Sequence, residues 1–72
     1  MIGEEQVIKV LHFTPVEDLN LFEYPGLTYF RNQYGEIVVK AETDFFVVGK
    51  GRELIPAKSI EEMEDILDRL RK

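Results

Sequence analysis

The chain of 72 residues carries a formal net charge of −5, is 44% hydrophobic and contains no cysteine. The length predicts a single domain over residues 1–72, and the composition argues against a disordered chain. The lack of cysteine excludes disulfides and thiolate metal sites. The chain has nine basic and fourteen acidic residues, which argues against binding to a nucleic-acid backbone, because proteins that do so use a clustered basic surface.

No apolar run approaches the roughly 18 residues that a membrane-spanning helix needs, and no charged segment followed by an apolar one opens the chain. We therefore expect a soluble, cytoplasmic protein with no membrane partner. A core built from so short a chain is of marginal stability, so self-association is an economical way to bury more surface.

The first third of the chain predicts a strand followed by a short helix. Residues 6–13 have apolar side chains on both sides of an extended segment, which indicates a strand. Thr14-Pro15-Val16-Glu17 has the pattern of a helix start, with a capping Thr, a Pro at the first helical position and a Glu three residues after the cap. We expect one or two helical turns over residues 15–21. Pro25-Gly26 then predicts a turn.

Residues 27–50 predict a three-stranded antiparallel meander with strands over 27–32, 36–42 and 45–50, and the rest of the chain covers it. The first turn has Asn32 and Gly35 where a type I turn and a left-handed residue are needed. The second turn lies around Thr43-Asp44. The predicted opposite pairs are Arg31 with Glu36, Phe30 with Ile37, Val39 with Val48, and Ala41 with Phe46.

Alternation along the strands sorts the meander into two faces. The face expected to meet a helix carries Thr28, Phe30, Ile37, Val39, Ala41, Phe46 and Val48. The opposite face, which is mixed in polarity, carries Leu27, Tyr29, Arg31, Val38, Lys40, Glu42, Phe45 and Val47.

The last third predicts a turn over 49–52, a short edge strand over 54–57 that tolerates Pro56, and one helix over 59–71. Ser59 is the expected cap, with Glu62 at the capping-box position. The apolar stripe of this helix is Ile60, Met63, Ile66, Leu67 and Leu70, and we expect it to pack on Phe30, Val39 and Val48. The expected ion pairs are Asp65 with Arg69 and Asp68 with Lys72. The predicted fold is α+β: an antiparallel sheet of four to five strands with a C-terminal helix on one face.

No residue pattern predicts catalysis, a cofactor or a metal. His12 is the single histidine and has no identifiable nucleophile to serve, and Ser59, the single serine, is explained as a cap. Gly49-x-Gly51 lacks the glycine fingerprint of a phosphate loop. The helix acids Glu61 with Asp65, and Glu64 with Asp68, lack the additional loop oxygens of a calcium site. We expect a protein that is not an enzyme.

Two other function classes are considered. Tyr29, Phe30, Arg31 and Tyr34 form an aromatic and basic cluster of the kind that stacks single-stranded bases, although Phe30 is expected in the core. The acidic charge, net −4 over residues 1–26 and −2 over 59–72, would suit a small phage-type inhibitor that mimics nucleic acid.

The favoured prediction is a protein-interaction module. A helix of about 13 residues is roughly 20 Å long and covers one side of a small sheet only. An uncovered apolar face usually marks an interface, so we expect a homodimer or a complex with another protein. The predicted interface residues are Leu27, Tyr29, Val38, Phe45 and Val47.

Overall fold

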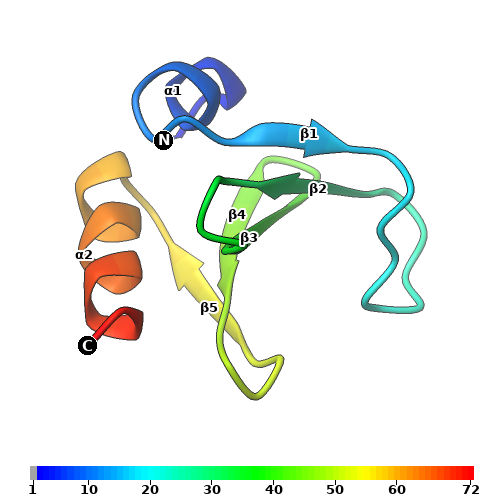
Figure 1. The fold of residues 1–72 in the computed structure, drawn as a ribbon. Coiled ribbons are helices and arrows are strands. Elements are labelled where there is room, and N and C mark those ends of the chain that lie inside the picture. Colours follow the sequence, from blue (N-terminus) through cyan, green and yellow to red (C-terminus); the bar gives the residue numbers. More distant parts are fainter. Residues whose placement is uncertain (1) are drawn as a thin grey trace.

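The computed structural model describes residues 2–72, so residue 1 of the predicted domain lies outside it. Its elements are α1 (Glu4–Lys9), β1 (Thr14–Val16), β2 (Leu27–Arg31), β3 (Ile37–Ala41), β4 (Asp44–Val48), β5 (Leu54–Ala57) and α2 (Ile60–Leu70). The strands form one antiparallel sheet in the order β1-β2-β3-β4-β5. The predicted α+β meander with a C-terminal helix packed on it is confirmed (Figure 1). Neither helix in this part of the chain has the length and apolar character to cross a membrane.

A three-residue loop sets the register between β2 and β3. The Asn32 side-chain oxygen accepts hydrogen bonds from the backbone N–H groups of Tyr34 (3.1 Å) and Glu36 (2.9 Å). Gly35 has a φ of +77°, which glycine adopts without strain. The Asn32 N–H donates to the Glu36 carbonyl, so these two residues close the hairpin. Arg31 therefore lies opposite Ile37, and the predicted register was wrong by one residue because the predicted loop was one residue too long.

A two-residue loop, Glu42 and Thr43, joins β3 to β4. Ala41 lies opposite Asp44, and Val39 lies opposite Phe46. Glu42 takes the left-handed conformation with a φ of +58°, so the tight turn does not depend on Thr43 adopting it. The predicted pairs in this hairpin were wrong by two residues, which leaves the relation between the faces of β3 and β4 as predicted.

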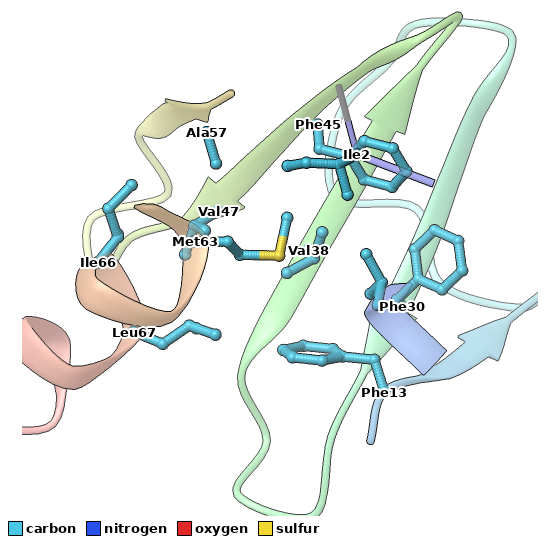
Figure 2. Packing of buried hydrophobic residues seen from close by; sticks show 11 residues of the cluster. Ile2, Phe13, Phe30, Val38, Phe45, Val47, Ala57, Met63, Ile66 and Leu67 are labelled. Carbon is cyan, nitrogen blue, oxygen red and sulfur yellow. The ribbon is translucent and has the colours of Figure 1, made fainter. Parts of the chain in front are cut away.

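The helix-facing side of the sheet follows from the β2–β3 register. Phe30 shares this side with Val38, and both belong to the buried core with Val47. In Figure 2, Met63 of α2 reaches toward Val38 and Val47. Of the residues predicted to lie under α2, Phe30 is on the helix side and in the core cluster, whereas Val39 and Val48 are on the other face, because a shift of one residue exchanges the two faces of a strand. The core cluster comprises Ile2, Val7, Phe13, Phe30, Val38, Phe45, Val47, Ala57, Met63, Ile66 and Leu67.

Residues 4–9 form helix α1, so the strand predicted over 6–13 was wrong. Val7 is fully buried and Leu11, four residues later, packs against the core, which is helical spacing. The N–H of Gly3 donates to the side-chain oxygen of Gln6, and two acids in the first turn suit the helix dipole. An apolar run of this length fits either structure, and the N-terminal charges favour the helix.

The segment predicted as a helix over 15–21 contains strand β1 instead. Thr14, Pro15 and Val16 lie opposite Arg31, Phe30 and Tyr29 of β2. Pairing with β2 therefore overrides the local helix-start pattern, as tertiary contacts commonly do. Residues 17–26 then connect β1 to β2. Figure 1 shows this connection on one side of the sheet and the two helices on the other.

Helix α2 forms where the sequence predicted it. The Ser59 hydroxyl accepts a hydrogen bond from the Glu62 N–H (3.1 Å), which confirms the cap. The Glu62 carboxylate in turn accepts from the Lys58 N–H (2.9 Å). The Asp65 pair with Arg69 is confirmed at 2.8 Å. Asp68 pairs with Arg71 at 3.4 Å in place of the predicted Lys72. The edge strand β5 is confirmed too, with Pro56 opposite Phe46.

Replacing Leu67 by Ala tests whether the α2 stripe is core. Leu67 is 2% exposed, so Leu67→Ala should lower the free energy of unfolding by about 2–5 kcal/mol in a denaturant titration. Val10→Ala serves as the control, because Val10 is 54% exposed, and should change stability by no more than about 0.5 kcal/mol. Equal effects of the two substitutions would contradict this packing.

Candidate docking surface on the second sheet face

The five predicted interface residues do not lie on one exposed surface. Val38, Phe45 and Val47 are 0%, 2% and 0% exposed and belong to the core under α2. Only Leu27 and Tyr29 lie on the opposite face, where Leu27 is half-buried and Tyr29 is 4% exposed. The prediction that these five are uncovered was wrong, because the β2–β3 register brings the face that contains Val38 under the helix. A charged residue at Phe45 or Val47 would disrupt the core.

The face turned away from α2 is here called the second face. Strand alternation and the observed registers define it. It consists of Thr14 and Val16 of β1, Leu27, Tyr29 and Arg31 of β2, Ile37, Val39 and Ala41 of β3, Asp44, Phe46 and Val48 of β4, and Leu54 and Pro56 of β5. Only two of these thirteen side chains are charged, so this face has the composition of a surface that packs against something.

A continuous apolar row crosses all five strands of the second face. Its members lie directly opposite one another from strand to strand: Val16, Tyr29, Val39, Phe46 and Pro56. Neighbouring members are about 5 Å apart, so the row makes one uninterrupted apolar stripe from edge to edge of the sheet.

The connection over residues 17–26 shields the β1–β2 side of this face. The N–H of Phe22 donates to the hydroxyl of Tyr29 at 3.0 Å. Leu19, Leu21 and Phe22 are all half-buried. Tyr29 is therefore only 4% exposed: its ring is covered, and its hydroxyl accepts the hydrogen bond that a buried tyrosine needs.

The β4–β5 side of the second face is open. Phe46 and Val48 are half-buried, Pro56 is exposed and Leu54 is 39% exposed. No segment within residues 2–72 is placed over them by a hydrogen bond of the kind that ties residues 17–26 to Tyr29. The exposed apolar surface is therefore concentrated over the last two strands. The sequence carried part of this signal, since strand alternation places Phe46 with Val48 on one face of β4 and Leu54 with Pro56 on one face of β5.

Strand β5 is a poor template for adding another strand. Antiparallel pairs alternate between residues whose backbone groups bond to the neighbouring strand and residues whose groups point away. The Gly49 N–H donates to the Glu53 carbonyl at 2.9 Å, so Glu53 and every second residue after it bond to β4. Pro56 is not one of these residues, so its backbone groups point away from β4, to the open edge of the sheet. It has no N–H to offer there.

Strand β1, at the other edge, carries a proline in the equivalent position. The bond from Asn32 to Glu36 shows that Phe30 directs its backbone groups toward β3. Pro15 lies opposite Phe30, so its own backbone points away from β2 and toward solvent. Prolines at outward positions block both edges of the sheet, which argues against association by strand addition.

A polar cluster ties the C-terminus of α2 to the β2–β3 turn. The Arg71 guanidinium donates to both carboxylate oxygens of Glu36, at 2.7 and 2.9 Å. It also lies over the Tyr34 ring, 4.7 Å from its centre, and pairs with Asp68. Asn32 donates a further hydrogen bond to Glu36 at 2.7 Å. The sequence reasoning missed this contact because it assigned Glu36 to Arg31.

Opposing effects act on the pKa of Glu36. Partial burial of its carboxyl acts to raise the pKa, but hydrogen bonds from Arg71 and Asn32 and the positive charge of Arg71 lower it below the ordinary value. The same hydrogen bond raises the pKa of Arg71. These contacts of Arg71 with Glu36, Tyr34 and Asp68 fasten the end of α2 to the β2–β3 turn.

The residues considered for catalysis or metal binding are not assembled into a site. His12 is exposed and has a φ of +61° at the end of the α1 segment. In the 49–52 turn the left-handed residue is Arg52, and the Glu53 side chain occupies the space beside Gly49. Within the described residues, no three His, Asp or Glu side chains lie close enough together to hold a metal ion.

The aromatic and basic cluster considered for base stacking is divided between the two faces of the sheet. Phe30 is fully buried on the helix side, and Tyr29 is covered on the second face. Tyr34, which is 66% exposed, lies in the β2–β3 turn and is stacked with Arg71. These side chains therefore do not present one exposed stacking surface.

Comparisons with protein-family models, with curated proteins and with solved structures found no match to this chain. Its function is therefore argued from the second face and the charges around it.

Replacing Glu36 by Gln tests the polar cluster through its pH dependence. Because the folded-state pKa is lowered, the carboxylate stabilises the fold above its ordinary pKa of 4.5, and this contribution is lost as the pH falls through the folded-state value. Glu36→Gln should cost about 1 kcal/mol of unfolding free energy near neutral pH, and the difference from wild type should disappear in acid.

The matched control is Glu61→Gln, at an exposed position in the first turn of α2. It should give a small difference from wild type across the same pH range. A Glu36→Gln difference that stays constant down to acid pH would contradict the ionic contact with Arg71.

Proposed function

We propose that this chain is a non-enzymatic protein-interaction module that self-associates through its second sheet face. The observation that carries the proposal is the apolar row from Val16 to Pro56, with its exposed part over β4 and β5. A cytoplasmic location is part of the proposal, and cell fractionation tests it.

A dimer interface through the second face would extend beyond the five strands. A stable interface of standard size takes about 800 Å² from each partner. The total accessible surface is 5079 Å², so such an interface would use about a sixth of it. Five strands about 4.8 Å apart and of about five residues each give a face of roughly 19 Å by 16 Å, or about 300 Å². The rest of such an interface would come from residues 17–26 and the turns around the face.

The energetic reason for self-association is the small core. One sheet with helices on one side buries a single apolar layer, and a chain of 72 residues gains little net stability from that layer alone. Two copies placed face to face would form a second layer between sheets about 10 Å apart, as in a β-sandwich. The edge prolines hinder association by strand addition, but they do not hinder contact between the two faces.

The two alternatives have less support. A single-stranded nucleic-acid binder would need an exposed stacking surface, and Phe30 and Tyr29 are buried. A small acidic inhibitor rests on the net charge of −5, and no second observation favours it. Titration with single-stranded DNA at low salt tests the first of these.

Replacing Phe46 by Glu tests the proposed surface. Phe46 lies at the centre of the open apolar area, so a charge there should weaken dimerisation about 30-fold or more in analytical ultracentrifugation. Leu54→Glu, at the rim of the same area, should weaken it less. Circular dichroism should show that both variants stay folded.

The control is Val10→Glu, which places the same charge on an exposed apolar residue on the helix side. It should leave the dimer unchanged. A wild-type protein that stays monomeric at high micromolar concentration would overturn the proposal, and so would a dimer that Val10→Glu disrupts and Phe46→Glu does not.

A further inference from the structure

The charges that surround the second face are separated along the strand direction. One end of the sheet holds the 17–26 connection and the β3–β4 turn, and its exposed acids, here called the acidic end, are Glu17, Asp18, Glu23, Glu42 and Asp44. The opposite end holds the start of the β2–β3 turn and the β4–β5 turn, and its exposed bases, here called the basic end, are Arg31, Lys50 and Arg52.

These eight charges are free to meet a partner. None of them takes part in the ion pairs found within residues 2–72. Lys58 is the exception to the pattern, since it lies beyond β5 at the acidic end. Glu53, at the basic end, is turned toward Gly49 and Gly51, on the helix side of the turn.

The two ends are far enough apart to act independently. Leu27 and Arg31 mark the two ends of β2, and four residues of strand span about 13 Å. The Debye length at physiological salt is about 8 Å. Each end therefore presents its own sign of charge to whatever covers the apolar row.

Two symmetric ways of laying this face on its own copy keep the strands of the two sheets nearly aligned. With the two-fold axis along the strands, acidic end would meet acidic end and basic end would meet basic end. With the axis across the strands, along the apolar row, each acidic end would meet the basic end of the other copy. Like charges brought together are repulsive and opposite charges attractive, so the second arrangement is favoured.

We infer that two copies pair through the second face with their strands antiparallel, so that the acidic end of each copy covers the basic end of the other. This inference rests on the proposed self-association and adds its orientation. An axis across the strands leaves each strand over its counterpart, so the open β4–β5 surfaces of the two copies face each other and the two 17–26 connections meet over β1 and β2. Arg31 then lies near the partner's 17–26 connection, which holds Asp18, and Lys50 lies near the partner's Asp44.

In this arrangement the apolar contacts and the charge pairs have different roles. The newly buried area comes from the open part of the second face over β4 and β5, because Tyr29 and Val39 in the middle of the row are already only 4% and 1% exposed. Exposed charge pairs of this kind add little affinity individually and set orientation and partner choice. A surface with both signs at opposite ends is complementary to itself, whereas an unrelated apolar surface would lack the matching pattern. The dimer should also weaken as salt rises from about 0.05 to about 0.5 M.

Reversing the charge of one end at a time tests the orientation. The first variant, Arg31→Glu with Lys50→Glu, has two acidic ends, and the second, Asp18→Lys with Asp44→Lys, has two basic ends. Each alone should dimerise about tenfold or more weaker than wild type in analytical ultracentrifugation. An equimolar mixture of the two should form a heterodimer, and a chain with all four substitutions should regain the homodimer. All four positions are exposed, and thermal unfolding checks that each variant folds.

The outcomes separate the orientation from the dimer itself. If wild type dimerises and Phe46→Glu disrupts it, but the charge variants dimerise as well as wild type, the orientation is overturned and the proposed function stands. A first variant that dimerises more weakly and shows no preference for the second would also overturn it. A monomeric wild type would overturn both proposals.

Discussion

The turn that contains Asn32 and Gly35 is the constraint on which the rest of the structure depends. The Asn32 side chain accepts two backbone hydrogen bonds across the turn, and Gly35 takes the left-handed conformation that closes it after three residues. This places Phe30 opposite Val38. A loop one residue longer would move Val38 to the far side of the sheet and bring Val39 under α2. The length of this turn therefore decides both which residues form the core and which face of the sheet is turned away from α2.

Side-chain contacts around that turn stabilise this register. Arg71, at the end of α2, binds the Glu36 carboxylate with two hydrogen bonds and stacks on Tyr34. The helix that covers the core is thus fastened to the loop that sets the register. Within residues 2–72 no polar or charged residue is buried, so the core under α2 is purely apolar. The apolar row is left on the other side, where residues 17–26 cover only part of it.

Local patterns predicted those parts of the fold in which neighbouring residues decide the structure. The Ser59 cap, the apolar stripe of α2 and the alternation of three strands depend on short-range spacing, and these predictions are confirmed. The fold class followed from them. The β2–β3 register was missed because Asn32 and Gly35 are compatible with a three-residue or a four-residue loop, and the difference of one residue reverses every face assignment that depends on it.

The N-terminal predictions were wrong for a different reason. Val7 and Leu11 fit a strand or a helix, and Thr14-Pro15 fits a helix start or an edge strand, so distant contacts decide both segments. An interface on the face turned away from α2 was predicted from the size of one helix and the apolar content of the sheet, and it stays a prediction. Three of its five predicted residues, Val38, Phe45 and Val47, lie in the core instead, because their placement depended on the β2–β3 register.

The central claim is that the second face is where two copies meet, and NMR contacts between differently labelled copies test it most directly. A mixture of isotope-labelled and unlabelled protein reports contacts between copies separately from those within one copy. The account predicts intermolecular contacts of the Phe46 ring with apolar neighbours on the partner's second face, such as Val48, and none at Val10. Intermolecular contacts confined to the helix side, at Val10 or Tyr34, would contradict it.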